Sequence, residues 1–297
     1  MRSVVKNGLA ITAASALALG LGTTAASATD SSDRGRDNLQ VIGLSNGKTL
    51  STFTTNNPGR ARVIGTVRLA SDAKLVGIDY RVQNGALYGV GNNGGLYKID
   101  ARNAKATKVG HLTVALSGTN FGVDFNPAAN ALRVVSDNGQ NLRQPFATID
   151  DGVAGNDAPT VVDGPLNTPS GAATPVPGPT TQGVSGAAYT NNDLSAATAT
   201  TLFDINTTTD TVAIQSPANS GFLATTGNLG VDFAANSGFD IYSKVRPKVT
   251  GRTVELFPYA VSNGRLYDID LLTGQAEDDG RIGVAGVTDI AIPLNQL

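Results

Sequence analysis

Four aspartates recur at matching places in short motifs, and their carboxylates are the side chains best suited to chemistry. They are Asp79, Asp124, Asp232 and Asp289, and each follows a glycine by two or three residues. If they converge, their oxygens would suit a hard cation such as Ca²⁺, which offsets carboxylate repulsion. The competing interpretation is that each carboxyl accepts backbone N–H groups and ties neighbouring strands together. A further copy of the motif has Ala188 in place of the acid, which argues against a symmetric ring.

Paired carboxyls also serve sugar hydrolysis, in which two acids flank the scissile bond and one has a raised pKa. Asp is so abundant in this chain that a suitable pair would arise by chance, so abundance alone does not favour an enzyme. We therefore keep an extracellular hydrolase or lyase, acting on saccharide or lactone substrates through axial carboxylates, as an alternative only.

Arg133 and Arg143 are the candidate residues for an anion clamp. They flank the turn Asp137-Asn138-Gly139, so two guanidinium groups on one face would bind a carboxylate or phosphate. The simpler interpretation is that they form cross-strand ion pairs with Asp124 and Asp137. Such pairs contribute less than about 1 kcal/mol each when exposed. We favour this simpler interpretation.

Several kinds of catalysis are excluded by composition. The chain has no cysteine and a single histidine, His111, at a position that related segments fill with Thr66, Asn228 or Arg281. A three- or four-ligand zinc site and a His-Cys nucleophilic pair are therefore not expected. A Ser-His-Asp triad lacks the glycine pattern of a nucleophile elbow. His111 is expected to be a solvated residue at a strand end.

The elements that would position these residues are short strands. The aspartate motif begins at Gly77, Gly122, Gly186 and Gly230, in steps of 45, 64 and 44 residues. Further motifs are Leu-aromatic-x-Ile-Asp/Asn and a closing Gly-polar-aliphatic unit. In the clearest copy, the segments LVGIDY, ALYGVG, GLYKID and ATKVGHL are separated by NG, NNGG and RNAK. Alternating apolar residues with N-G turns predict antiparallel hairpins.

Four short strands in about 45 residues are typical of a β-propeller blade. Motif starts at 77, 122, 186, 230 and 286 predict an all-β propeller with five blades. Six blades is the alternative, because residues 230–282 hold an extra candidate strand, and a β-sandwich of similar hairpins is a second alternative. The C-terminal strand is expected to pair with the N-terminal blade and close the ring.

Residues 1–28 have the three-part organisation of a secretory signal peptide, ending in the cleavage signal Ala26-Ser27-Ala28. We expect cleavage after Ala28 and a secreted, extracellular protein without a lipid anchor. Residues 29–38 are expected to be a disordered leader, and residues 39–297 a single propeller domain. Residues 151–183, rich in Pro, Gly and Thr, predict a long surface insertion, with a functional lid as the alternative.

The chain also resembles a known bacterial family. The segments GVDFNPAANALRVVSDNGQNLR, QSPANSGFLATTGNLGVDF and LYDIDLLTG, with others, are similar to the family catalogued as domain of unknown function 4394. The resemblance runs from about Leu44 to the C-terminus. The family usually has an acid-Arg pair where this chain has Asn130-Ala131. The resemblance implies a repetitive β fold, often exported, and assigns no activity or catalytic residues.

These observations favour a secreted, non-enzymatic propeller that binds a ligand or protein at its axial face. Removing residues 1–28 leaves 20 Lys and Arg against 24 Asp and Glu, a net charge of −4. This balance gives no reason to expect nucleic acid, and no later segment is apolar for long enough to span a membrane. A monomer is expected, with no cofactor other than Ca²⁺ as a candidate. A structural component of the cell envelope is a further alternative.

Overall fold

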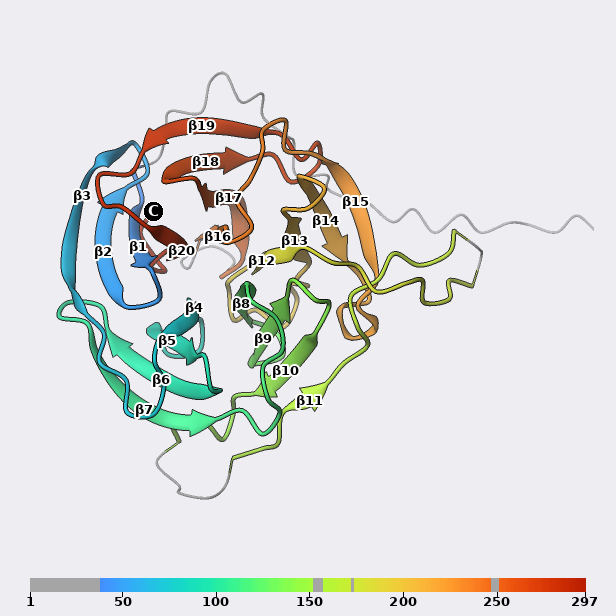
Figure 1. Ribbon diagram of the computed structural model, residues 1–297, viewed down its shortest axis with the longest axis horizontal. Helices are drawn as coiled ribbons and strands as arrows, with labels where there is room; N and C mark the ends of the chain where they lie inside the picture. Colours follow the sequence, from blue (N-terminus) through green and yellow to red (C-terminus); the bar gives the residue numbers. More distant parts are fainter. Residues whose placement is uncertain (1–37, 152–156, 172–173, 247–250) are drawn as a thin grey trace, which may run out of the picture.

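The computed structural model describes residues 38–151, 157–171, 174–246 and 251–297, which form five antiparallel sheets of four strands each. The sheets stand as blades around a central axis (Figure 1). The prediction of an all-β, five-bladed propeller is confirmed, and six blades is wrong. The predicted signal peptide and leader lie outside the described residues except for Asn38. No helix among the described residues is long and apolar enough to span a membrane.

Each blade runs from an inner strand at the axis to an outer strand at the rim. In that order, blade 1 contains β20 (Val287–Ala291), β1 (Gln40–Ser45), β2 (Thr49–Thr54) and β3 (Asn57–Thr66). Blade 2 contains β4 (Leu75–Arg81), β5 (Ala86–Gly91), β6 (Gly95–Asp100) and β7 (Lys105–His111). Blade 3 contains β8 (Phe121–Asn126), β9 (Ala131–Ser136), β10 (Asn141–Pro145) and β11 (Val161–Val162). Blade 4 contains β12 (Val184–Tyr189), β13 (Leu202–Asn206), β14 (Thr211–Gln215) and β15 (Leu223–Asn228), with a 3₁₀ helix, η2 (Ala218–Ser220), before β15. Blade 5 contains β16 (Gly238–Val245), β17 (Thr253–Ser262), β18 (Arg265–Ile269) and β19 (Ala276–Arg281).

The ring is closed by the C-terminal strand. β20 pairs antiparallel with β1, placing Asp289 opposite Leu44 and Ala291 opposite Ile42. The inner strands contact one another in the order β4, β8, β12, β16, β20 and back to β4. The predicted closure is therefore confirmed: blade 1 takes its inner strand from one end of the domain and its other strands from the opposite end.

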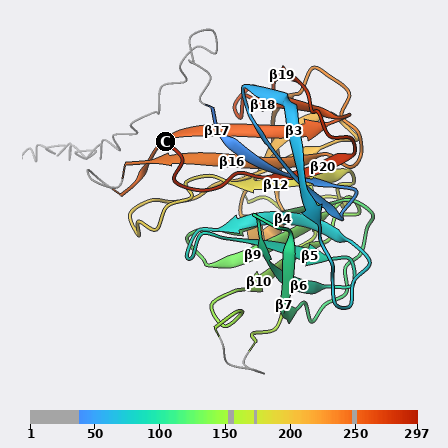
Figure 2. The same ribbon diagram turned by 90° about the vertical axis from the view of Figure 1, so that its left-hand side faces the viewer.

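Hairpins follow the predicted turn chemistry. Asn46-Gly47 and Asn263-Gly264 connect β1 to β2 and β17 to β18, and all four residues have positive φ, between 49° and 74°. Two consecutive left-handed residues form the type I′ turn, whose twist matches that of the strands, and Asn-Gly adopts it at least cost. In blade 5, the strands β16 and β17 form a long hairpin and lie side by side along their length (Figure 2).

The glycines that open the aspartate motifs of β4 and β8 are required because neighbouring inner strands approach closely there. A Cβ at Gly77 would lie 2.5 Å from Val123 Cγ2 on the next inner strand, and one at Gly122 would lie 2.6 Å from the backbone N of Ala187. Apolar side chains fill the spaces between neighbouring blades. Between blades 2 and 3, Tyr88, Phe125 and Phe146 make edge-to-face contacts with ring centroids 4.8 to 5.6 Å apart.

Blade 5 does not begin where the sequence pattern places it. The segment Gly230-Val231-Asp232-Phe233 matches the aspartate motif but forms no strand, and the inner strand is β16. This segment connects the rim strand β15 to the axis, and Phe233 packs against Tyr267 with ring centroids 5.0 Å apart. The prediction that Asp232 lies on an inner strand is wrong because Phe233 is drawn into the blade core while Asp232 stays exposed.

The Pro/Gly-rich insertion is more than a surface loop in its described part. It supplies β11, the outer strand of blade 3, which pairs with β10 at Leu142 and Arg143. Leu166 is fully buried in the core between blades 3 and 4. Asn167 is 1% exposed and bridges to both Thr180 and Phe222. The insertion is thus part of the blade 3–blade 4 interface.

Candidate functional site: the propeller axis

Four buried carboxyls meet at the axis, one on each of four inner strands. Three are predicted residues, Asp79 on β4, Asp124 on β8 and Asp289 on β20, and the fourth is Asp240 on β16, which the sequence analysis missed. They are 1% to 8% exposed, and we call them the hub carboxyls. Asp240 follows Gly238 at the expected spacing, but the next residue, Ile241, is not aromatic.

Each hub carboxyl accepts a hydrogen bond from the backbone of the next inner strand. The contacts are Ile78 N to Asp289 Oδ2 at 2.8 Å, Phe125 N to Asp79 Oδ2 at 2.7 Å, Tyr189 N to Asp124 Oδ1 at 3.1 Å and Ile292 N, just after β20, to Asp240 Oδ2 at 2.6 Å. These bonds link every neighbouring pair of inner strands except β12 and β16, where the motif has Ala188. The hub carboxyls therefore connect the blades, as expected if each carboxyl accepts backbone N–H groups and ties neighbouring strands together.

The same carboxyls are close enough to influence one another. One oxygen from each of Asp79, Asp124 and Asp240 lies within 4.8 Å of the other two. Burial, and then the charge of Asp240, raises the pKa of Asp79 well above its ordinary value, and burial followed by Asp79 does so for Asp124. Burial raises the pKa of Asp240 to about 7 and that of Asp289 well above its ordinary value. Near neutral pH the hub therefore retains protons, because burial disfavours the charged form and adjacent buried charges repel.

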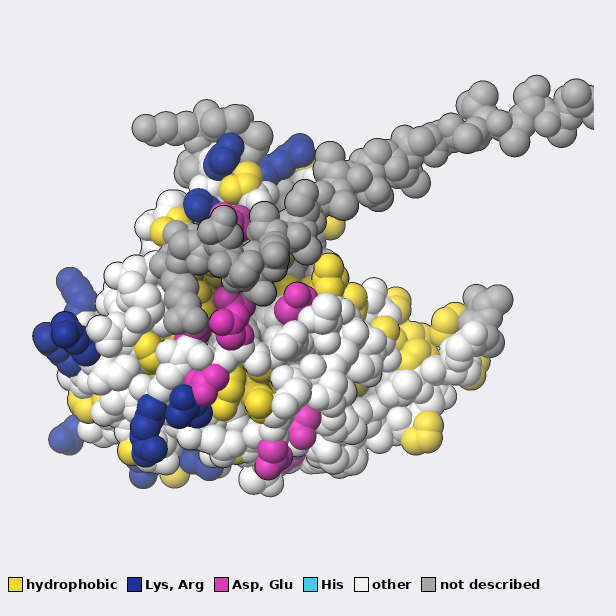
Figure 3. All heavy atoms as spheres, turned by 90° about the horizontal axis from the view of Figure 1, so that it is seen from above, with side chains coloured by type: hydrophobic (Ala, Val, Ile, Leu, Met, Phe, Trp, Pro, Cys, Tyr) yellow, Lys and Arg dark blue, Asp and Glu magenta, His cyan; other side chains and the backbone are white. Residues whose placement is uncertain are grey.

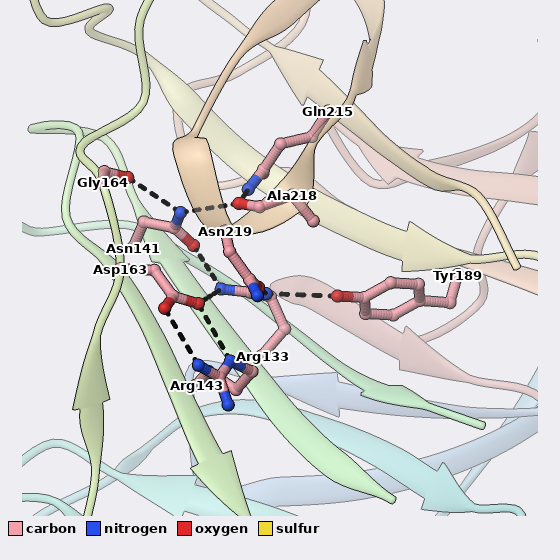
Figure 4. A network of polar contacts seen from close by, with 9 residues as sticks. All are labelled: Arg133, Asn141, Arg143, Asp163, Gly164, Tyr189, Gln215, Ala218 and Asn219. Atoms are coloured by element: carbon pink, nitrogen blue, oxygen red, sulfur yellow. Dashed lines mark hydrogen bonds and ion pairs between the residues drawn. The ribbon is translucent and has the colours of Figure 1, made fainter. Parts of the chain in front are cut away.

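Arg133 and Arg143 do not form the expected ion pairs with Asp124 and Asp137. Both bind Asp163 of the insertion instead: Arg133 Nη1 donates to Oδ2 at 2.7 Å, and Arg143 Nε donates to the same oxygen at 3.1 Å (Figure 4). Asp137 accepts backbone N–H groups from Thr119 and Asn120. No sequence pattern points to Asp163, because it lies outside the repeat.

The Arg133 side chain is 2% exposed, and its guanidinium donates to three residues besides Asp163. Its guanidinium donates to Asn141 Oδ1 at 2.8 Å, Asn219 Oδ1 at 2.9 Å and Tyr189 Oη at 3.3 Å (Figure 4). An anion would have to replace Asp163 to reach it. This geometry favours a structural tie between blade 3, blade 4 and the insertion over an open anion clamp.

Asp204 is a second buried acid that the sequence analysis missed. It lies on β13, is fully buried, and neither carboxyl oxygen has a hydrogen-bond partner among the described residues. It lies opposite Ala187 and Ala213 in the sheet, on the face that packs toward blade 3. Burial raises the pKa of Asp204 to about 8, although the Arg133 guanidinium acts in the opposite direction. Asp204 is therefore neutral over most of the physiological pH range.

A concave pocket of about 290 Å³ opens at the axis, where the inner strands begin. Every blade contributes a polar side chain to it: Thr288 from blade 1, Lys74 next to blade 2, Asn120 before β8, Ser185 from blade 4 and Asn236 before β16. None of the described lining residues is acidic. In the sequence, these lining residues share one feature: each is a polar residue at or just before the start of an inner strand.

A second cavity, of about 450 Å³, lies where the inner strands end. It is lined by Gln83 and Pro127 and, in the segment after β12, by Asn191 and residues 193–196. His111 belongs to neither cavity: it is exposed at the end of β7, in agreement with the prediction of a solvated residue.

Solved structures resemble the fold at low sequence identity. A protein of unknown function from Bacteroides thetaiotaomicron is 11% identical with a TM-score of 0.45, and the match covers 79% of this chain and 54% of that one. A chain of a nidogen/laminin complex is 9% identical with a TM-score of 0.46, covering 87% and 99%. An auxiliary nutrient binding protein from Bacteroides thetaiotaomicron is 14% identical with a TM-score of 0.40, covering 74% and 55%. This chain thus spans about half the length of the first and third of these proteins.

Comparison with curated proteins gives no significant match. Residues 49–291, which include strands of all five blades and the four hub carboxyls, match one protein family. The chain therefore belongs to the family described as a domain of unknown function, DUF4394.

Proposed function

We propose that this protein is an exported, non-enzymatic propeller that binds a small polar ligand in the axial pocket where its inner strands begin. The observation that carries this proposal is that all five blades place polar side chains around one concavity. A rigid ring that presents loop residues around its axis is a common way to build a binding site.

The pocket's chemistry supports an uncharged or singly anionic ligand. Among the described residues that line it, the polar side chains are amides and hydroxyls together with the ionic group of Lys74. Amides and hydroxyls both donate and accept hydrogen bonds, which suits polyhydroxylated molecules.

The competing hydrolase or lyase is less well supported. The hub carboxyls are at most 8% exposed and accept backbone N–H groups, and none of the described residues that line the pocket is an acid. A glycosidase pair must instead flank the substrate bond from both sides.

A thermal-shift screen of neutral sugars, polyols and small hydroxy acids tests the binding proposal. A ligand specific to the native state raises the free energy of unfolding by about 2.7 kcal/mol at a concentration of 100 Kd. Asn236→Trp, at the pocket mouth, should abolish the shift, whereas Leu272→Trp, in an exposed rim turn, should preserve it. A screen without hits, or hits that survive Asn236→Trp, would rule out the axial pocket.

Calcium binding at the hub is a second proposal, favoured by the three carboxyl oxygens that lie within 4.8 Å of one another. Oxygen ligands suit Ca²⁺, and a bound cation would favour the ionised carboxylates. Thermal unfolding with Ca²⁺ and with chelator tests it, and Asp240→Asn should remove any stabilisation. An unchanged midpoint would eliminate the calcium proposal and leave the pocket proposal intact.

Export rests on residues 1–28, which have the composition of a signal peptide. Expression of the full chain in a bacterial host, followed by N-terminal sequencing of protein from the medium, should give a mature chain that begins at Thr29. Recovery of uncleaved chain from the cytoplasm alone would contradict export.

A further inference from the structure

Exposed basic side chains follow the outer edge of blades 1 and 2. They are Arg60 and Arg62 on β3, Arg68 just after it, and Lys105 and Lys108 on β7, and we call them the basic rim. Figure 3 shows Lys and Arg side chains gathered at the left, the side on which Figure 1 draws β3.

The basic rim has one sign of charge. Residues 57–71 contain three arginines and no acid, and residues 101–119 contain one arginine, two lysines and no acid. No member of the basic rim forms an ion pair within the described part of the chain. The ion pairs found nearby, Lys98–Asp150 and Arg102–Asp100, involve other residues. The rim charges are therefore available to a partner.

Strand register places two of these cations at the seam between the blades. Arg62 lies opposite Thr52, which lies opposite Ile42, and Ile42 packs in the core between blades 1 and 2. Lys108 lies opposite Tyr97, which belongs to the same core cluster. Directly opposed residues share a sheet face, so Arg62 and Lys108 approach the seam from its two sides.

The end of β3 contacts the turn just before β7, which brings the two halves of the basic rim together. A Cβ at Gly65, near the end of β3, would lie 3.2 Å from Ala104 Cβ and 3.3 Å from Asn103 O, just before β7. Lys108 Nζ donates to Ser71 Oγ at 3.0 Å, which joins β7 to the segment that leaves blade 1. A partner that follows the edge could contact both blades.

Protection of sheet edges does not explain the uniform charge. Charged side chains on outer strands discourage edge-to-edge pairing whatever their sign. The outer strand of blade 5, β19, reads AEDDGR and is mainly acidic, and that of blade 4, β15, reads LATTGN and is uncharged. Figure 3 shows acidic side chains over the middle of the molecule, whereas the side chains gathered at its far left edge are basic. The basic rim is thus a local feature.

We propose that the basic rim binds a flexible, linear polyanion that carries phosphate or carboxylate groups along its length. The cations are exposed and spread along an edge, so they fit repeated charges on a chain better than a single small anion in a pocket. The exposed large hydrophobic residues of the described chain include no aromatic. Single-stranded nucleic acid is bound largely by stacking on aromatic side chains, so a polymer without bases is the better fit. This site is independent of the axial pocket.

Binding of the full chain to end-labelled polyphosphate and to labelled poly-L-glutamate tests this proposal, with the two polymers distinguishing phosphate from carboxylate. The variant Arg60→Gln/Arg62→Gln/Lys108→Gln should weaken binding at low salt by about 10-fold or more. The slope of log K against log salt should fall by about 2, since each lost contact to a single-stranded polyanion removes about 0.7. The variant Arg68→Gln/Lys105→Gln, at the other rim positions, should weaken binding in the same direction.

The matched control is Arg246→Gln/Arg252→Gln/Arg265→Gln, on and beside the strands of blade 5, which makes the same change in net charge away from both the basic rim and the axial pocket. It should bind both polymers like the original chain, and all variants should keep the original unfolding midpoint because the changed residues are on the surface. Equal weakening in the control, no binding of either polymer by the original chain, or binding of poly-U alone would overturn the proposal.

Discussion

The hub carboxyls and Asp204 are all buried acids, and they differ in their hydrogen-bond partners. Each hub carboxyl accepts a backbone N–H from the next inner strand, whereas both oxygens of Asp204 have no partner among the described residues. A buried, unpartnered carboxyl favours its neutral form strongly. Replacing Asp204 is therefore expected to stabilise the protein, whereas replacing a hub carboxyl removes hydrogen bonds between blades and is expected to destabilise it.

Asp204→Asn should stabilise the protein increasingly as pH rises. The folded-state pKa of about 8 lies above the ordinary value of 3.8, so the native state retains a proton that the unfolded state loses. Asp204 thus lowers the free energy of unfolding as pH rises from about 4 to about 8, by up to several kcal/mol at 1.4 kcal/mol per pKa unit. Urea unfolding at pH 5 and pH 8 measures this. Asp232→Asn, an exposed position, is the control, and a difference between Asp204→Asn and the original chain that does not grow with pH would contradict the assignment.

Asp79→Ala should destabilise the protein, because it leaves the backbone N–H groups of Tyr80 and Phe125 without their acceptor at the axis. Each unsatisfied buried donor costs about 1–3 kcal/mol. Asp79→Asn keeps one acceptor oxygen and should lose less. Equilibrium denaturation compares both with Asp232→Ala, and similar midpoints for Asp79→Ala and Asp232→Ala would refute a linking role for the hub.

Sequence pattern identified three of the four hub acids and misplaced the fourth. Gly230-Val231-Asp232-Phe233 is a better match to the motif than Gly238-Phe239-Asp240-Ile241, and only the packing of the chain distinguishes them. Asp204 was hidden because its segment resembles LYKID and LYDID, which form third strands, whereas β13 is a second strand. Because β13 lies one strand closer to the axis than those third strands, the polar residue at this position, Asp204, is fully buried.

The insertion is held in place by a few individual contacts. Its strand β11 has two residues, and Asp163 directly after it binds two arginines of blade 3. Its composition predicted a surface loop because little of it can be buried. The anchoring residues, Asp163, Leu166 and Asn167, have no counterpart in the other repeats, so only the folded structure reveals them. The regular hairpins, by contrast, followed from Asn-Gly turns and alternating apolar residues.

Asp163→Asn should be strongly destabilising, because it leaves Arg133 buried without its carboxylate. Breaking a buried pair by removing one partner costs about 3–5 kcal/mol. Arg143→Gln should cost less, since the Arg143 side chain is 29% exposed. Chemical denaturation measures both, and Asp278→Asn, which breaks the exposed pair with Arg265, should change little. Equal effects of Asp163→Asn and Asp278→Asn would show that the buried network does not anchor the insertion.

For the whole molecule, closure of the ring determines both proposed sites. The axial pocket needs all five inner strands in place, and the basic rim needs blades 1 and 2 side by side. Repetition in the sequence predicted the ring. Its closure was predicted because the C-terminal strand has no partner in its own blade, and the N-terminal blade lacks an inner strand. The two proposed binding sites could not be predicted from the repeat, because the polar and basic residues that form them differ from blade to blade.

An engineered disulfide between β1 and β20 tests the closure most directly, since the chain has no cysteine of its own. Ile42 and Ala291 are directly opposed, and opposed residues in antiparallel strands have Cα atoms about 4.5–5.5 Å apart, within the range that a disulfide spans. Ile42→Cys/Ala291→Cys should oxidise to an intramolecular disulfide in the folded protein, visible as loss of both free thiols in a monomer. The pair Ile42→Cys/Thr225→Cys, with its second cysteine on β15, should keep both thiols free. Two persistently free thiols at positions 42 and 291 in the folded protein would contradict the closed ring.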